Sequence, residues 1–208
     1  MTETITTVLA ISSAIGLGAM SPGPSFLYVA RNAMTKSRRH GFATALGTGA
    51  GAAVFAILAL CGLQALLLAV PSAYMFLKVL GGLYLLWVAF NIYRGSKTPL
   101  VMGDAVVAQG HYLATFRDGF LTQISNPKTA VVFASVFTAL LPKEIPSQYY
   151  YLLPSLCFVI DAGWYSIVAF VLSAERPRNV YLRFRKVLDR SACVVMSLLG
   201  LKLIFSSR

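Results

Sequence analysis

The chain has 208 residues, of which 57% are hydrophobic and only 12% are charged, and its mean hydropathy is +0.71. Soluble domains carry about 25% charged residues, so this composition excludes a soluble globular protein and predicts an all-α integral membrane protein. The net charge of +11 comes without a basic domain that could bind nucleic acid, and we therefore expect it to reflect membrane topology.

Six apolar segments are each long enough to cross the hydrocarbon layer, which takes about 20 helical residues. They cover residues 5–30, 42–70, 72–93, 119–142, 147–173 and 187–205. The connections between them are mostly short. We therefore expect six transmembrane helices in one transmembrane domain over residues 1–208, with no separate soluble domain.

The first apolar segment is interrupted by Ser21, Pro22, Gly23 and Pro24. The two prolines disfavour helical geometry in the residues before them, so a helix must stop here and restart near Ser25. In lipid, such a break is tolerated only where it is buried in protein or lines a cavity. The restarted helix presents unpaired amides that attract an anion, and Phe26 and Tyr28 could form an aromatic wall for a small zwitterion. A packing kink without a ligand is the alternative.

The second segment carries small residues at helical spacing, namely Gly41, Ala45, Gly49 and Ala52 on one stripe and Gly47 and Gly51 in a G-x-x-x-G pattern. Small residues let another helix approach closely. We expect these stripes to serve helix packing, either within one subunit or between two copies in a homodimer.

Metal ligands are not predicted. Cys61, Cys157 and Cys193 form no C-x-x-C pair, and His40 and His111 have no partner at metal-ligand spacing. We therefore expect no metal site, no cofactor and packing roles for the cysteines.

A second interruption follows at residues 125–127, and the spacing from Gly119 to Pro127 equals that from Gly16 to Pro24. Three spans per half would invert the second copy, as in the 3+3 inverted repeats of secondary transporters. The halves would be residues 1–95 and 111–208, joined by a cytoplasmic linker at 95–110. The residues at the second break are Ser125, Asn126, Pro127 and Lys128.

The side chains at the second break leave two interpretations open. Asn126 is placed to cap the restarting helix. Lys128 could meet a substrate carboxylate, or it could extend from a shallow position to the cytoplasmic surface.

Asp161 is an acid in the interior of an apolar segment, between Ile160 and Ala162. Acids in that environment usually face the bundle interior, pair with a cation or relay protons. A structural hydrogen bond to a neighbouring helix is the alternative. Tyr165 lies one turn on and shares the face of Asp161.

Basic residues cluster in alternate connections, which fixes the expected orientation. The rich connections contain Arg31, Lys36, Arg38 and Arg39, then Arg94, Lys97 and Arg117, then Arg176, Arg178, Arg183, Arg185 and Lys186. Only Lys78 and Lys143 lie on the other side. The positive-inside rule makes the three rich connections cytoplasmic and places both termini on the outer side of the membrane.

The combined pattern resembles the LysE/RhtB family of amino-acid exporters, and most closely its homoserine and threonine branch. The resemblance covers nearly the whole chain and rests on residues 20–24, on Gly81–Leu85 with Arg94 and Gly95, on Gly119–Leu121 with residues 126–128, and on Asp161. It implies a secondary-active exporter of small amino acids in the bacterial inner membrane. Proton antiport is expected, without nucleotide hydrolysis.

The resulting hypothesis is that the helix starts after Pro24 and Pro127, aided by Lys128, bind the substrate carboxylate, while Asp161 faces the ammonium group and releases it on protonation. A cation or heavy-metal exporter is an alternative, but clustered Cys, His or acidic ligands are missing from the sequence. A membrane-embedded enzyme would need a nucleophile, base or metal constellation that the segments lack. A structural or regulatory membrane subunit is the remaining alternative.

Overall fold

The computed structural model describes residues 2–69, 71–95, 111–142, 144–174, 187, 190–191, 193–202 and 204–205. All regular structure in these residues is helical. The labelled helices are α1 (Thr2–Met20), α2 (Pro24–Thr35), α3 (Arg38–Ala69), α4 (Pro71–Gly95), α5 (Tyr112–Ile124), α6 (Pro127–Leu140) and α7 (Tyr149–Leu172), and a further apolar helix covers Cys193–Lys202. The all-α prediction is confirmed.

Both predicted breaks are present. Helix α1 ends at Met20 and α2 starts at Pro24, with a bend of 58° between the two axes. Helix α5 ends at Ile124 and α6 starts at Pro127. A proline at the first helical position lacks only an N–H that would be unpaired there in any case, so each proline starts the new helix without cost.

By length and composition, two helices among the described residues can cross a membrane, Arg38–Leu63 and Tyr149–Leu172. The bent pair of Thr4–Met20 and Pro24–Thr35 would make a third span. The predicted total of six therefore stays a prediction. Residues 96–110, which make up almost all of the predicted linker, and the basic residues 176–186 lie outside the described residues.

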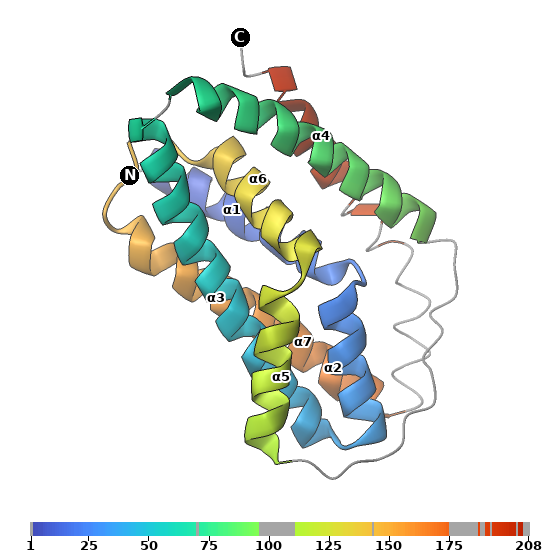
Figure 1. Ribbon diagram of the computed structural model, residues 1–208. Coiled ribbons are helices and arrows are strands. Elements are labelled where there is room, and N and C mark those ends of the chain that lie inside the picture. The colour runs from blue at the N-terminus through green and yellow to red at the C-terminus, as the bar shows by residue number, and fades with distance from the viewer. Residues whose placement is uncertain are drawn as a thin grey trace.

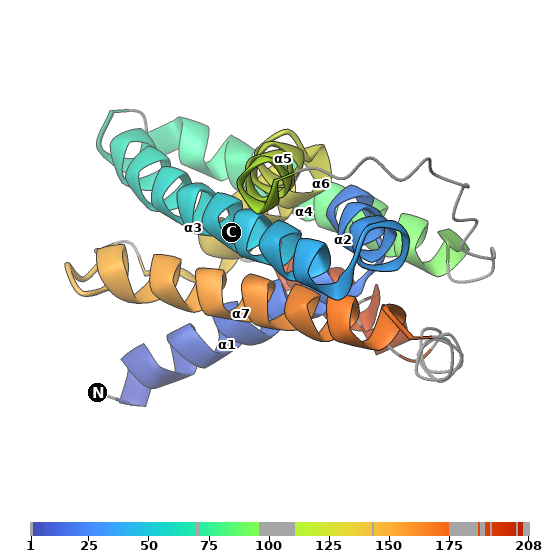
Figure 2. The same ribbon diagram turned by 90° about the horizontal axis from the view of Figure 1, so that it is seen from below.

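Helix α3 lies at the centre and packs along α7 on one side and α5 on the other (Figures 1 and 2). A Cβ at Gly49 would lie 2.7 Å from the Cβ of Ala162 in α7, and one at Gly51 would lie 2.7 Å from the Cβ of Gln123 in α5. A Cβ at Gly47 would overlap the carbonyl of Phe116 in α5. The packing role predicted for these glycines is confirmed, and the contacts lie within one chain.

Helix α7 and the two breaks come together because α3 holds α5 and α7 in place, with α1 crossing beside α6 (Figure 1). A large apolar core joins α1, α3, α6 and α7. A second core joins α2, α3 and α7 around the fully buried Phe26. The breaks lie between these two apolar regions.

Candidate functional site

Hydrogen bonds join the two breaks directly. The Asn126 side-chain amide Nδ2 donates to Ser25 Oγ at 3.1 Å. The Lys128 ammonium Nζ donates to the carbonyl oxygen of Ser21 at 2.9 Å and to that of Gly18 at 3.3 Å. Two segments about a hundred residues apart therefore meet at one place, and residues from both supply the polar groups there.

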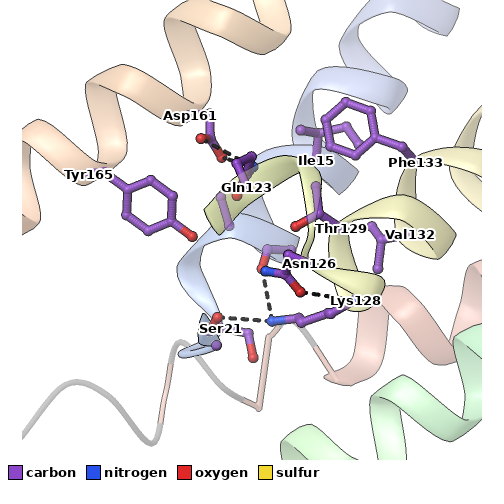
Figure 3. A pocket seen from close by; sticks show the side chains of 13 residues that line it. Ile15, Ser21, Gln123, Asn126, Lys128, Thr129, Val132, Phe133, Asp161 and Tyr165 are labelled. Carbon is purple, nitrogen blue, oxygen red and sulfur yellow. Dashed lines mark hydrogen bonds between the residues drawn. The ribbon is translucent and has the colours of Figure 1, made fainter. Parts of the chain in front are cut away.

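A cavity of about 30 Å³ lies between the breaks and α7. Its polar lining is formed by Ser21, Gly23, Gln123, Asn126, Lys128, Thr129, Asp161 and Tyr165, and its apolar lining by Ile15, Gly18, Ala19, Val132 and Phe133. Figure 3 shows Asp161 and Lys128 at opposite ends of this group. A volume of about 30 Å³ accommodates one or two water molecules, so an amino acid needs more room than this conformation provides.

Asp161 is only 2% exposed, and its partner on α5 is Gln123, which is equally buried. The Gln123 amide Nε2 donates to both carboxyl oxygens at 3.4 Å. The other end of the same amide, Oε1, accepts a hydrogen bond from the Ser25 hydroxyl. Thr48 of α3 also lies within hydrogen-bonding reach of the carboxyl group. A buried carboxyl with polar neighbours on two other helices satisfies the requirement that buried polar groups be hydrogen-bonded.

Lys128 lies in the first turn of α6 and points back to the end of α1 (Figure 3). The last carbonyl groups of a helix have no intrahelical partner and carry the negative end of its dipole. The ammonium group therefore caps α1 across the break. Of the two sequence interpretations, the geometry favours the cavity, because Lys128 lines it and donates to backbone there.

The N-terminal ends of α2 and α6 are capped differently. Asn126 caps α6, since its Oδ1 accepts a hydrogen bond from the Lys128 backbone N–H at 3.1 Å. The corresponding position before α2 is Gly23, which has no side chain to do so. The first turn of α2 thus has amides that no side chain caps at its N-cap position, beside the cavity.

The prolines and Tyr28 do not line the cavity. Pro24 and Pro127 are exposed and Pro22 is half-buried, so these residues shape the backbone. Tyr28 is absent from the cavity lining, and its hydroxyl donates to Asp118 at 3.4 Å. The aromatic rings at the cavity are those of Tyr165 and Phe133.

Gln123 was not among the residues singled out in the sequence. The available signal was an amide in the turn just before the second break. Nothing in the sequence indicated that its side chain would reach α7. Thr129, Ile15 and Phe133 were missed for the same reason, because helix packing determines which face of α6 and α1 meets the cavity. Among the described residues, no three His, Cys, Asp or Glu side chains cluster in a way that could hold a metal ion.

Comparison with known proteins gives a consistent result. The family described as LysE type translocator matches residues 17–207. A threonine efflux protein of Salmonella typhi is 31% identical over 192 residues, which cover 90% of this chain and 92% of the relative. A threonine efflux protein of Escherichia coli K12 is 31% identical over 189 residues with the same coverage. An uncharacterized membrane protein of the same organism, YahN, is 27% identical over 185 residues, or 89% of this chain and 83% of the relative. No solved structure matches the chain.

Proposed function

The chain belongs to the LysE type translocator family, and from this premise we propose that it exports threonine, homoserine or a similar small amino acid across the bacterial inner membrane in exchange for protons. Members of this family are membrane transporters and not enzymes. The threonine assignment comes from the named activity of the relatives that share nearly the full length of the chain.

One observation carries the proposal: a carboxyl group and an ammonium group line the same cavity where two broken helices meet. Asp161 and Lys128 lie at opposite ends of the cavity (Figure 3). An amino acid is a zwitterion, so a site for it needs an anionic and a cationic partner in reach of one another. Transporters commonly build such sites from interrupted helices whose ends face the substrate.

The substrate carboxylate would bind between the Lys128 ammonium and the first turn of α2. Both groups favour an anion, and the Gly23 position leaves that turn without a side-chain cap. The substrate ammonium would face the Asp161 carboxylate. Thr129 lines the cavity, and Ser25 is hydrogen-bonded to two residues of its lining, Gln123 and Asn126, so either hydroxyl would be available to a hydroxyl on the substrate side chain.

The small volume of the cavity supports transport by alternating access. About 30 Å³ is too small for threonine, so the substrate enters and leaves through other conformations. In each of these, the cavity would open to one side of the membrane only.

Proton coupling would follow from competition at Asp161. The carboxylate binds the substrate ammonium, whereas the protonated acid has no charge to offer it. A proton taken up from the periplasm would release the amino acid outward. Rebinding of an amino acid from the cytoplasm would then displace the proton inward. One acid cannot hold a proton and pair with the substrate at once, so the two fluxes run in opposite directions.

The experiment is efflux of labelled threonine, homoserine and leucine from cells that express the chain, with and without a protonophore. We expect export of threonine or homoserine that the protonophore abolishes. Asp161→Asn, with insertion verified, should lose this export. Unchanged export with the same pH dependence in that variant would refute the coupling role, and no export of any amino acid by the parent chain would refute the substrate class.

We also propose that both termini lie in the periplasm and that residues 95–110 are cytoplasmic. An impermeant thiol reagent added to intact cells should label a cysteine introduced at Thr4 but not one at Arg39, in a chain whose own cysteines are replaced. The reverse pattern would invert the orientation.

A further inference from the structure

Gln123 links the proposed proton site to the first helix break. We propose that Gln123 is a positioning residue, whose amide makes the contact between α5 and the first turn of α2 depend on whether Asp161 carries a proton. The inference rests on the proposed function for its role in transport. Its structural content can be tested without any substrate.

The geometry in this structure suits the carboxylate form of Asp161. A carboxylate is only an acceptor, and the Gln123 Nε2 amide donates to both of its oxygens at 3.4 Å. The amide oxygen Oε1 then points the other way and accepts from the Ser25 hydroxyl. Ser25 Oγ in turn accepts from Asn126 Nδ2 at 3.1 Å. Gln123 therefore ties α7, α2 and the second break together through one side chain.

Protonation changes what Asp161 requires of that amide. The acid gains one O–H donor, and a buried donor left unpaired is destabilising. A carboxylic acid and a primary amide can form a cyclic pair in which the O–H donates to the amide oxygen and the N–H donates to the acid carbonyl. Forming this pair turns Oε1 toward α7 and away from Ser25. The Ser25 hydroxyl then loses its acceptor, which loosens α2 from α5 at the break.

Other groups near the Asp161 carboxyl could also respond to its protonation, and the experiment has to distinguish them from Gln123. Thr48 of α3 lies within reach of Asp161. Its hydroxyl donates to the Ala45 carbonyl at 2.8 Å, so its oxygen is left as a competing acceptor for the Asp161 proton. Among the described residues, the other ionisable side chains that line the cavity are Lys128 and Tyr165. Cys157 lies one turn before Asp161 on α7.

The direct test is a distance between α2 and α5 as a function of pH. Leu27 on α2 and Leu121 on α5 are 39% and 46% exposed and can carry spin labels in a chain whose three cysteines are replaced by alanine. We expect the distance distribution in liposomes to differ between acidic and alkaline buffer. Gln123→Leu, which keeps the approximate volume but removes both hydrogen-bonding ends, should lose the difference.

Asn32→Leu is the matched control. Asn32 is also a buried amide, 3% exposed, and it donates to Thr44 at 3.0 Å between α2 and α3, outside the cavity. This variant should keep the pH-dependent difference, and Gln123→Asn should restore part of it. The proposal is overturned if the parent chain shows no pH dependence, if Gln123→Leu retains it, or if Asn32→Leu loses it as well. Loss in Thr48→Val but not in Gln123→Leu would assign the role to Thr48 and also overturn it.

Transport separates this inference from the proposed function. In proteoliposomes, the ratio of net threonine movement driven by a pH gradient to threonine exchange at equal pH on both sides should be lower in Gln123→Leu than in the parent chain. A parent chain that exchanges no threonine would refute the proposed substrate, while the spin-label distances would still decide the role of Gln123.

Discussion

The Lys128 ammonium holds the end of α1 from the start of α6. It donates to the carbonyl oxygens of Ser21 and Gly18 and lines the same cavity as Asp161. These two carbonyl oxygens are neutral and do not cancel the charge of the ammonium group, which attracts anions. We infer that a substrate carboxylate would share this ammonium with the α1 carbonyls, so Lys128 would serve both the fold of the break and the binding of substrate.

Replacing Lys128 tests that dual role. Charge-assisted hydrogen bonds contribute about 1.5–3 kcal/mol, so Lys128→Met should raise the KM for threonine about 10- to 100-fold. The KM of Lys128→Arg should lie between those of the parent chain and Lys128→Met. Lys36→Met removes a lysine at the C-cap of α2, outside the cavity, and controls for the loss of positive charge. Initial rates of threonine exchange in proteoliposomes give the KM, and an unchanged value in Lys128→Met would exclude a contact with the substrate.

At this scale the sequence identifies residues whose chemistry is costly in lipid. Asp161 and Lys128 stand out because a charge in an apolar segment needs a reason, and the structure brings both to one cavity. The contacts of Gln123 and Tyr28 could not be predicted in this way. An amide and a phenol are tolerated in many places. Only the packing of α5 and α7 on α3, and of α2 against α5, decides that Gln123 reaches Asp161 while Tyr28 reaches Asp118. The substrate roles of these residues stay predictions.

The helices are positioned by close approaches to α3. A Cβ at Gly47 would overlap the carbonyl of Phe116 and lie 2.9 Å from the backbone nitrogen of Phe120. From the other side, a Cβ at Gly119 in α5 would lie 3.0 Å from the Cα of Thr44. Backbone atoms cannot move aside as a flexible side chain can. The crossing of α3 and α5 therefore fixes where Gln123 and the second break lie.

Gly47→Ala should displace α5 and destabilise the protein. Overpacking of this kind costs about 1–3 kcal/mol. Gly163→Ala is the matched control, because a Cβ at Gly163 on α7 would meet no atom within 4 Å. The thermal unfolding midpoint of detergent-purified protein should fall in Gly47→Ala and stay at or slightly above the parent value in Gly163→Ala. Equal midpoints in both variants would mean that α3 and α5 do not approach this closely.

The element boundaries follow from local chemistry, which is why the sequence predicts them well. Proline disfavours helical geometry before it wherever it occurs, so the breaks before Pro24 and Pro127 need no knowledge of the fold. The sequence could not predict which helices the glycine stripes would contact, because small residues permit many partners. The structure places the stripes of α3 against α2, α5 and α7 and Gly200 against Gly82 and Leu86 of α4.

In the molecule as a whole, the site has room for only one or two water molecules. Its lining comes from the two breaks and from α1, α5, α6 and α7. Each broken segment is followed by a long helix, α3 in the first part of the chain and α7 in the second. This order agrees with the proposed half-repeats, which stay a prediction, as do the six spans and the homodimer. The glycine stripes of α3 are occupied within one chain, so a dimer would use another surface.

If a proton and an amino acid compete for Asp161, threonine binding must release that proton. Isothermal titration of purified protein, repeated in buffers with different ionisation enthalpies, counts the protons released. At a pH where Asp161 is protonated in the free protein, we expect about one proton per threonine bound and weaker binding as the pH falls. Asp161→Asn should release none. Threonine binding without proton release by the parent chain, or proton release that persists in Asp161→Asn, would exclude competition between the proton and threonine at Asp161.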